Sequence, residues 1–169
     1  YGHAVLAPAA GQHGMAVSAQ KLASGVGARI LAKGGNAADA AVAMGYALAV
    51  VYPAAGNLGG GGFMLLREPA KPAVFVDFRE KAPLAATPDM YLDSKGNVIQ
   101  GQSILGWKAV AVPGTVAGLE NVHRRWGHLP RQTVMEPAIA LARDGFVLGE
   151  GHVELLHTST QAFAKDPYA

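Results

Sequence analysis

The segment Asp77-Phe-Arg-Glu80 has the clearest potential for chemistry in this sequence. It ends an apolar run typical of a strand, and the two-residue period of a strand places Arg79 on the same face as Phe75 and Asp77. An arginine at a strand end can bind a carboxylate through two parallel hydrogen bonds, and it does not lose its charge. Arg79 is therefore a candidate ligand-binding residue. A structural ion pair with Asp77 or Glu80 is the alternative interpretation, because such pairs are common.

The glycines at positions 59–62 also permit two interpretations. A phosphate-binding loop has its glycines after a strand and before a helix, and a lysine usually follows them. Here a helical pattern precedes Gly59–Gly62, a strand pattern follows, and no lysine comes next. We therefore predict that these glycines allow close packing of the backbone or form a bulge.

The sequence contains no recognisable motif for a catalytic nucleophile or for a metal site. There are no cysteines, and no Gly-x-Ser-x-Gly segment surrounds a serine. The six histidines include two pairs spaced five residues apart, whereas helical metal ligands favour a spacing of four. The sequence therefore predicts no metal site, and it shows no catalytic nucleophile.

The composition excludes several classes of protein. Of the 169 residues, 50% are hydrophobic and only 15% are charged, so the chain is not of the disordered type. The net charge of +2 and the absence of a dense basic cluster argue against a nucleic-acid partner. The uncharged run from Ala40 to Leu66 is interrupted by Pro53 and several glycines, so we predict no membrane span.

The first half of the chain shows one weak strand pattern and two helices. A short strand is predicted over Gly14–Ser18, and an amphipathic helix over residues 20–33. Asn36 is expected to cap a second helix over Ala37–Val51, with Asp39 in its first turn. This second helix is apolar on every side, so we expect it to be buried.

The remaining pattern predicts a hairpin followed by helices. Strands are expected at Phe63–Leu66 and Ala73–Phe78, paired antiparallel in the centre of a sheet. Loops and a turn at Asp93–Asn97 should follow, and then three helices, at Gly114–Trp126, Gln132–Arg143 and Val153–Phe163. This order indicates layers of sheet and helix, and no boundary divides residues 1–169 into domains.

Several segments together resemble one known family, the γ-glutamyltranspeptidases, in the N-terminal part of their large subunit. The resemblance is collinear from about Gly14 to Phe146. It rests on Leu22-Ala-Ser-Gly-Val-Gly27, Ile30-Leu-Ala-Lys-Gly-Gly-Asn-Ala-Ala-Asp-Ala-Ala-Val42, Gly59-Gly-Gly-Gly-Phe-Met64, Asp77-Phe-Arg-Glu80 with Ala82-Pro83, Thr87-Pro-Asp-Met90, Val112-Pro-Gly-Thr-Val-Ala-Gly-Leu119 and Glu136-Pro-Ala-Ile-Ala-Leu-Ala-Arg-Asp-Gly-Phe146.

The resemblance implies an α/β layered (αββα) fold of the N-terminal-nucleophile hydrolase type. In this family one precursor cuts itself into a large and a small chain, and both contribute to the fold. The new N-terminal threonine of the small chain attacks the γ-glutamyl carbonyl of glutathione-type substrates and forms an acyl-enzyme. Water or an acceptor amine then takes the acyl group. No metal ion or organic cofactor is required.

The resemblance assigns substrate binding to Arg79, as the residue that holds the α-carboxylate of the glutamyl group. It places no catalytic residue in this chain, because a threonine within the chain cannot supply a free α-amine; these are Thr87, Thr115, Thr133, Thr158 and Thr160. We therefore expect residues 1–169 to form a single incomplete domain, part of a fold completed by the small catalytic subunit from the same precursor. Alone, the chain should be inactive. A periplasmic or secreted location is the expectation for such a protein.

Two alternative functions remain open at this point. The chain could belong to an amidase or acylase of the same fold, such as a β-lactam side-chain acylase, since family members differ mainly in the substrate pocket. It could also be a non-catalytic relative or a binding module, because a fold alone does not fix a function.

Overall fold

A computed structural model describes residues 10–165 of the chain. The chain separates into two compact units, and each is described by itself. The helical unit comprises residues up to Gly56 together with residues from Trp126 onward. The hairpin unit comprises residues Asn57–Arg125.

Helix α1 (Lys21–Ala32) confirms the first predicted helix. The side chain of Gln20 caps its start by accepting a hydrogen bond from the Leu22 N–H. Gly34, with φ at 87°, reverses the chain after the helix, which is a conformation that favours glycine. The buried face of α1 includes Val26 and Ile30, in agreement with its amphipathic pattern.

The prediction of a strand over Gly14–Ser18 is wrong. These residues pair with no strand in the described part of the chain. Instead, Ser18 turns the chain into α1, because its N–H donates to the Ser24 hydroxyl at 2.9 Å and its own hydroxyl donates to the Gln20 carbonyl at 2.8 Å. An alternating segment forms a strand only where a neighbouring strand accepts its hydrogen bonds.

Helix α2 (Ala37–Val51) has the bounds that the sequence predicts. Asn36 and Asp39 form a capping box, in which each side chain accepts a hydrogen bond from the other residue's N–H. Asp39 is fully buried, and it also accepts the N–H groups of His128 and Leu129 at 3.1–3.4 Å. This carboxylate therefore joins the start of α2 to the segment that leads into the next helix of the unit.

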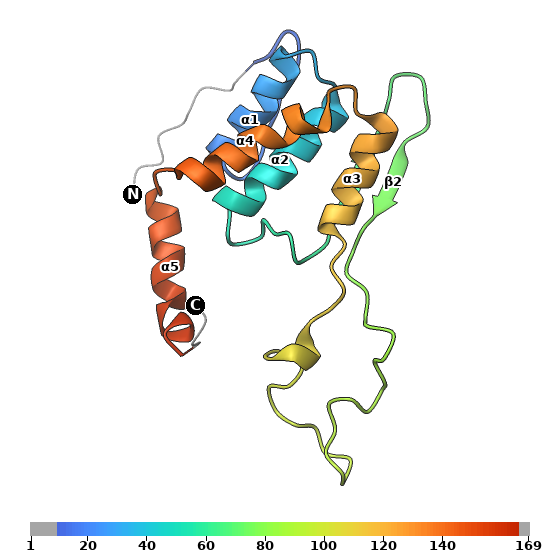
Figure 1. Cartoon of the computed structure of the whole chain (residues 1–169), viewed down its shortest axis with the longest axis vertical. Coiled ribbons are helices and arrows are strands. Elements are labelled where there is room, and N and C mark those ends of the chain that lie inside the picture. Colours follow the sequence, from blue (N-terminus) through green and yellow to red (C-terminus); the bar gives the residue numbers. More distant parts are fainter. Residues whose placement is uncertain (1–9, 166–169) are drawn as a thin grey trace. The chain divides into compact units, whose positions relative to one another are not determined.

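Helix α4 (Arg131–Asp144) confirms another predicted helix, and it ends at Gly145, where φ is 78°. In the helical unit, α1 and α4 both pack on α2 (Figure 1), which explains the burial of most of this apolar helix. Helix α5 (Glu150–Phe163) begins three residues before the predicted start. Its His152 lies with Nε2 2.7 Å from the Val51 carbonyl oxygen, at the end of α2.

The hairpin unit contains an antiparallel pair of strands, β1 (Phe63–Leu66) and β2 (Val74–Asp77). Phe63 pairs with Asp77 and Leu66 with Val74, so the predicted hairpin is confirmed. Val76 on one face is buried, whereas Phe75 on the other is 62% exposed. The described residues contain only these two strands, so a place at the centre of a larger sheet stays a prediction.

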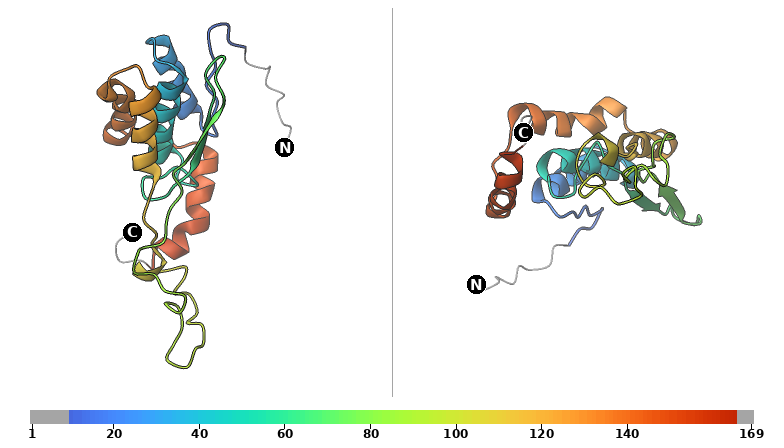
Figure 2. Two further views of the ribbon diagram at one scale, coloured as in Figure 1. Left: turned by 90° about the vertical axis from the view of Figure 1, so that its right-hand side faces the viewer. Right: turned by 90° about the horizontal axis from the view of Figure 1, so that it is seen from below.

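A long connection joins β2 to helix α3 (Thr115–Trp126). Figure 2 shows this connection from two further sides as a chain that is mostly irregular. It contains the short 3₁₀ helix η1 (Trp107–Ala109) and two isolated bridges, Lys81 with Val112 and Leu92 with Val98. The predicted turn at residues 93–97 is confirmed, because the Asp93 carboxylate accepts the N–H groups of Lys95 and Asn97.

Candidate functional site

Arg79 lies two residues beyond the end of β2, in the hairpin unit. Its side chain is 69% exposed. The guanidinium carbon lies 5.9 Å from the centre of the Phe63 ring, a distance at which the ring face attracts a cation. Phe63 in turn stacks on Phe75, with ring centres 5.6 Å apart. The cation therefore sits beside an exposed aromatic pair and faces solvent.

The two acidic neighbours of Arg79, Asp77 and Glu80, make no close hydrogen bond to its guanidinium. The Asp77 carboxylate accepts the backbone N–H of Arg79 at 2.9 Å, so it fixes the main chain where β2 ends. The Glu80 carboxylate oxygen lies 3.9 Å from Arg79 Nε, too far for a hydrogen bond. An exposed ion pair at this distance holds a guanidinium weakly, so Arg79 can exchange it for an incoming carboxylate.

The glycine run packs directly against the backbone that carries Arg79. A Cβ atom placed on Gly61 would lie 2.8 Å from Arg79 Cα and 2.7 Å from the Glu80 nitrogen. A Cβ atom on Gly62 would lie 2.9 Å from the Phe78 ring. These contacts leave no room for side chains at Gly61 and Gly62, so the prediction of close packing is confirmed for these two glycines, whereas a Cβ atom on Gly59 would meet nothing within 4 Å.

The start of α3 is hydrogen-bonded to the glycine run. The Gly60 carbonyl accepts the N–H groups of Gly114 and Thr115 at 2.8 and 3.0 Å, where a helix has free donors. Within the glycine run itself, the Gly60 N–H donates to the Asn57 side chain and the Gly62 N–H donates to the Phe78 carbonyl, which argues against a phosphate-binding role for this run. Gly118, one turn further along α3, contacts the Phe78 ring so closely that a Cβ atom there would lie 2.2 Å from it.

The Phe78 ring is therefore held between Gly62 and Gly118. Because Phe78 directly precedes Arg79, this packing fixes the backbone next to Arg79. The sequence pattern did not identify Gly114 or Gly118 as residues that pack against Phe78. Their spacing of four residues, which places both on one face of a helix, is the signal that could have indicated it.

A hollow of about 290 Å³ lies beside Arg79, between the end of β2 and α3. Its wall is mixed, with apolar residues such as Val76 and Phe78 beside polar ones, which are Asp77, Arg79, Lys81 and Asn121. Such a wall can receive a small molecule that carries an anionic group next to an aliphatic part.

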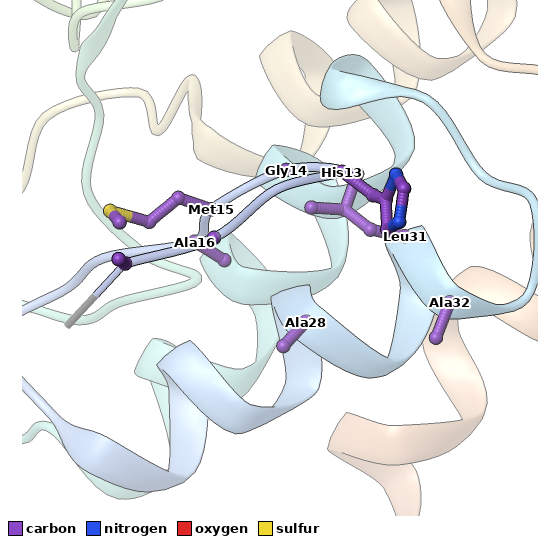
Figure 3. A pocket seen from close by; sticks show the side chains of 9 residues that line it. His13, Gly14, Met15, Ala16, Ala28, Leu31 and Ala32 are labelled. Atoms are coloured by element: carbon purple, nitrogen blue, oxygen red, sulfur yellow. The ribbon is translucent and has the colours of Figure 1, made fainter.

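A larger hollow, of about 530 Å³, lies in the helical unit between residues 10–16 and α1. Figure 3 shows its mainly apolar lining, which includes Met15, Leu31 and several alanines, with His13 as the only titratable side chain. This hollow brings together no pair of groups that could act as acid and base or hold an anion, so it is not the candidate site.

Metal-ligating side chains do not gather at any point of the described residues. Within residues 10–165, no three His, Cys, Asp or Glu side chains lie close enough to hold a metal ion. Thr158 and Thr160 donate their hydroxyls to carbonyls of their own helix. Backbone N–H groups lower the pKa of Asp93, and Arg143 lowers that of Asp144, but these carboxylates lie in the loop and at the end of α4.

Comparison with known proteins places the chain in a fold and a family. Over 96% of its length it superimposes on the crystal structure of Helicobacter pylori gamma-glutamyltranspeptidase, with a TM-score of 0.91 and 44% identity. A cephalosporin acylase from Bacillus halodurans, 24% identical with a TM-score of 0.76, shares the fold alone. The chain thus carries part of the αββα fold of the N-terminal-nucleophile hydrolases, which confirms the predicted fold class.

The family is defined by sequence as well. The family model for gamma-glutamyltranspeptidase matches residues 23–169. A glutathione hydrolase proenzyme of Pseudomonas sp. (strain A14) is 58% identical over 95% of this chain. The chain belongs to the gamma-glutamyltranspeptidase family. It spans 28% of that relative's length and 46% of the Helicobacter pylori chain.

Proposed function

We propose that the protein containing this chain hydrolyses or transfers γ-glutamyl groups from glutathione-type amides, and that the chain is its large-subunit portion. The family membership and the 58% identity to a protein named glutathione hydrolase proenzyme support this function. Arg79 is the substrate-binding residue of the proposal. It holds the α-carboxylate of the glutamyl group.

The exposed guanidinium of Arg79 is the observation that carries this assignment. An arginine committed to a structural ion pair makes close, paired hydrogen bonds to an acid. The Arg79 guanidinium makes no such pair: its side chain is 69% exposed, and the Glu80 carboxylate oxygen lies 3.9 Å from its Nε. Its main chain is nevertheless fixed by Asp77 and the glycine run. A fixed backbone with a free charged end suits a residue that binds a ligand.

The catalytic residue belongs to a second chain in this proposal. The threonine at the start of the small subunit attacks the γ-carbonyl carbon with its hydroxyl oxygen, and its own α-amine takes the hydroxyl proton. The carbon–nitrogen bond of the amide then breaks, the leaving amine takes a proton, and an ester to the threonine remains. Water or an acceptor amine attacks this ester and releases the threonine hydroxyl.

The exposed apolar face of the hairpin is consistent with a partner chain that covers it. Phe63, Leu65 and Phe75 on this side are between 53% and 73% exposed, which is a large apolar area for a protein surface. We propose that the small subunit from the same precursor covers it, and that residues 1–169 are one incomplete domain that this subunit completes. The word proenzyme in the name of the Pseudomonas relative fits a precursor that is cut.

A periplasmic or secreted location is also part of the proposal. It follows from the resemblance to the family. Within residues 10–165, no helix is long and apolar enough to cross a membrane.

The acylase alternative has weaker support. The Bacillus halodurans acylase shares the fold alone with this chain, at 24% identity, whereas the relatives above share the family. A non-catalytic relative would keep the fold but would not react with a γ-glutamyl donor.

Two anilide substrates test the proposal in the full-length protein. One is a γ-glutamyl anilide, and the other is a 4-aminobutyryl anilide, which is the same molecule without the α-carboxylate. We define the selectivity ratio as kcat/KM for the first divided by kcat/KM for the second. A hydrogen-bonded charge is worth roughly 1.5–3 kcal/mol, so Arg79→Met should lower this ratio by about 10- to 150-fold.

Arg67→Met is the matched control, because Arg67 is exposed and lies at the turn end of the same hairpin. It should leave the selectivity ratio unchanged. A ratio that is also unchanged in Arg79→Met would refute Arg79 as the carboxylate-binding residue. A protein that turns over neither anilide would refute the enzymatic function.

A further inference from the structure

We infer that Thr115 is a positioning residue for Arg79, with its hydroxyl acting through Asn57 and the glycine run. The inference rests on the proposed role of Arg79 in binding the α-carboxylate. All of the contacts that carry it lie within the hairpin unit.

The first link is a side-chain hydrogen bond across 58 residues of sequence. Thr115 is the first residue of α3 and is only 7% exposed. Its hydroxyl donates to the Asn57 side-chain oxygen at 2.5 Å. The same oxygen accepts the Gly60 N–H at 2.8 Å. One oxygen atom therefore joins the start of α3 to the glycine run.

The second link is made by the backbone carbonyl of Gly60. The Gly60 carbonyl accepts the N–H groups of Gly114 and Thr115. Both polar groups of the Gly60 backbone are thus held by partners that involve Thr115 or its neighbour. A glycine has the largest conformational freedom of any residue, so this segment needs such bonds to keep one conformation.

The third link leads from the glycine run to Arg79. Gly61 packs against the Arg79 Cα and the Glu80 nitrogen, with the Glu80 carboxylate beside them. The Phe78 N–H donates to the Gly62 carbonyl at 3.1 Å, which extends the strand pairing up to the residue before Arg79. Any shift of Gly60 therefore reaches the Arg79 backbone through rigid main-chain contacts rather than through adaptable side chains.

These contacts require a hydroxyl group at position 115. A valine at position 115 has the shape of threonine and fills the same space, but it cannot donate to Asn57. A serine keeps the hydroxyl and loses only a methyl group. If the hydroxyl positions Arg79, Thr115→Val should disturb carboxylate recognition and Thr115→Ser should restore it. If Thr115 only fills space, valine should be the better replacement.

The test measures the selectivity ratio defined above in the full-length protein. A misplacement of about 1 Å can cost on the order of 100-fold, so a partial loosening of the glycine run should lower the ratio about tenfold in Thr115→Val. Most of this change should appear in KM for the γ-glutamyl anilide. Thr115→Ser should stay within about twofold of the wild type by the same argument.

Thr133→Val is the matched control, because it makes the same chemical change on α4 in the helical unit. It should leave the ratio unchanged. If Thr115→Val does not yield folded protein, Thr115→Ala removes the same hydroxyl and carries the same prediction. Thermal unfolding of each variant shows that the protein compared is folded.

The possible results separate this inference from the proposed function. A lower ratio in Thr115→Val with recovery in Thr115→Ser supports positioning. An unchanged ratio in Thr115→Val, or an equal loss on both anilides, overturns it while the effect of Arg79→Met still stands. An equal loss in the serine and valine variants also overturns it. An unchanged ratio in Arg79→Met would remove the proposed role of Arg79 itself.

Discussion

Replacing Gly61 with alanine should displace Arg79 without touching its side chain. The new Cβ atom would lie 2.8 Å from Arg79 Cα and 2.7 Å from the Glu80 nitrogen. Carbon atoms in ordinary contact are at least about 3.5 Å apart, so the Arg79 backbone would have to retreat by about 0.7 Å if the glycine run stays in place.

The size of the functional effect follows from this displacement. A misplacement of about 1 Å at a site can cost on the order of 100-fold in rate, so a shift of about 0.7 Å should lower the selectivity ratio by at least about tenfold. The strain should also lower the free energy of unfolding, by about 1–3 kcal/mol for an overpacked contact.

Gly59→Ala provides the matched control within the same run of glycines. A Cβ atom on Gly59 would meet nothing within 4 Å. Its selectivity ratio should therefore equal that of the wild type. Both variants are compared with the γ-glutamyl and 4-aminobutyryl anilides, and their melting temperatures are measured alongside. The reasoning is refuted if Gly61→Ala keeps the wild-type ratio, or if both substrates lose the same factor.

Two further predictions concern the scaffold. Asp39 is fully buried and accepts the N–H groups of Asn36, His128 and Leu129, so Asp39→Ala should lower the free energy of unfolding by about 3 kcal/mol in urea titration. An effect no larger than that of Asp144→Ala, which removes an exposed carboxylate, would contradict this. The second concerns Asp93, whose pKa is lowered mainly by the N–H groups of Asn97 and Lys95. A lowered pKa means that the turn gains stability above the ordinary aspartate pKa and loses it as the pH falls through the lowered value. The Asn97 amide shift in NMR should therefore titrate below the ordinary aspartate range, and a midpoint within or above that range would contradict the assignment.

The parts of the fold that the sequence predicts correctly are determined by nearby residues. The bounds of α2 follow from Asn36 and Asp39, which lie three residues apart and cap the helix by local hydrogen bonds. The hairpin follows from two short apolar runs, Phe63–Leu66 and Ala73–Phe78, that are separated by a turn. The two-residue period of a strand then places Val76 on the buried face and Phe75 on the exposed face.

The parts that the sequence does not predict depend on partners far along the chain. Nothing near Asp39 in the sequence indicates that it binds His128 and Leu129, about 90 residues away. The hydrogen bond between Asn57 and Thr115 is hidden for the same reason. The segment at Gly14–Ser18 has a strand-like pattern, but no described strand pairs with it, so its pattern alone could not decide its structure.

The candidate site combines both kinds of information. The position of Arg79 at a strand end can be predicted from the apolar run that precedes it. Its exposure, the 3.9 Å distance to Glu80 and the packing of Gly61 against its backbone can be read only from the structure. The glycine run illustrates the difference, since its order in the sequence excludes a phosphate loop but does not say what packs against it.

The most direct test of the central claim is mass analysis of the purified full-length protein, with N-terminal sequencing of every chain, before and after exposure to a γ-glutamyl donor. We expect two chains, one containing this sequence and a second that begins with threonine. The second chain alone should gain the mass of one γ-glutamyl group. A single uncut chain, a second chain without an N-terminal threonine, or the absence of any added mass on rapid quenching would contradict the proposed function.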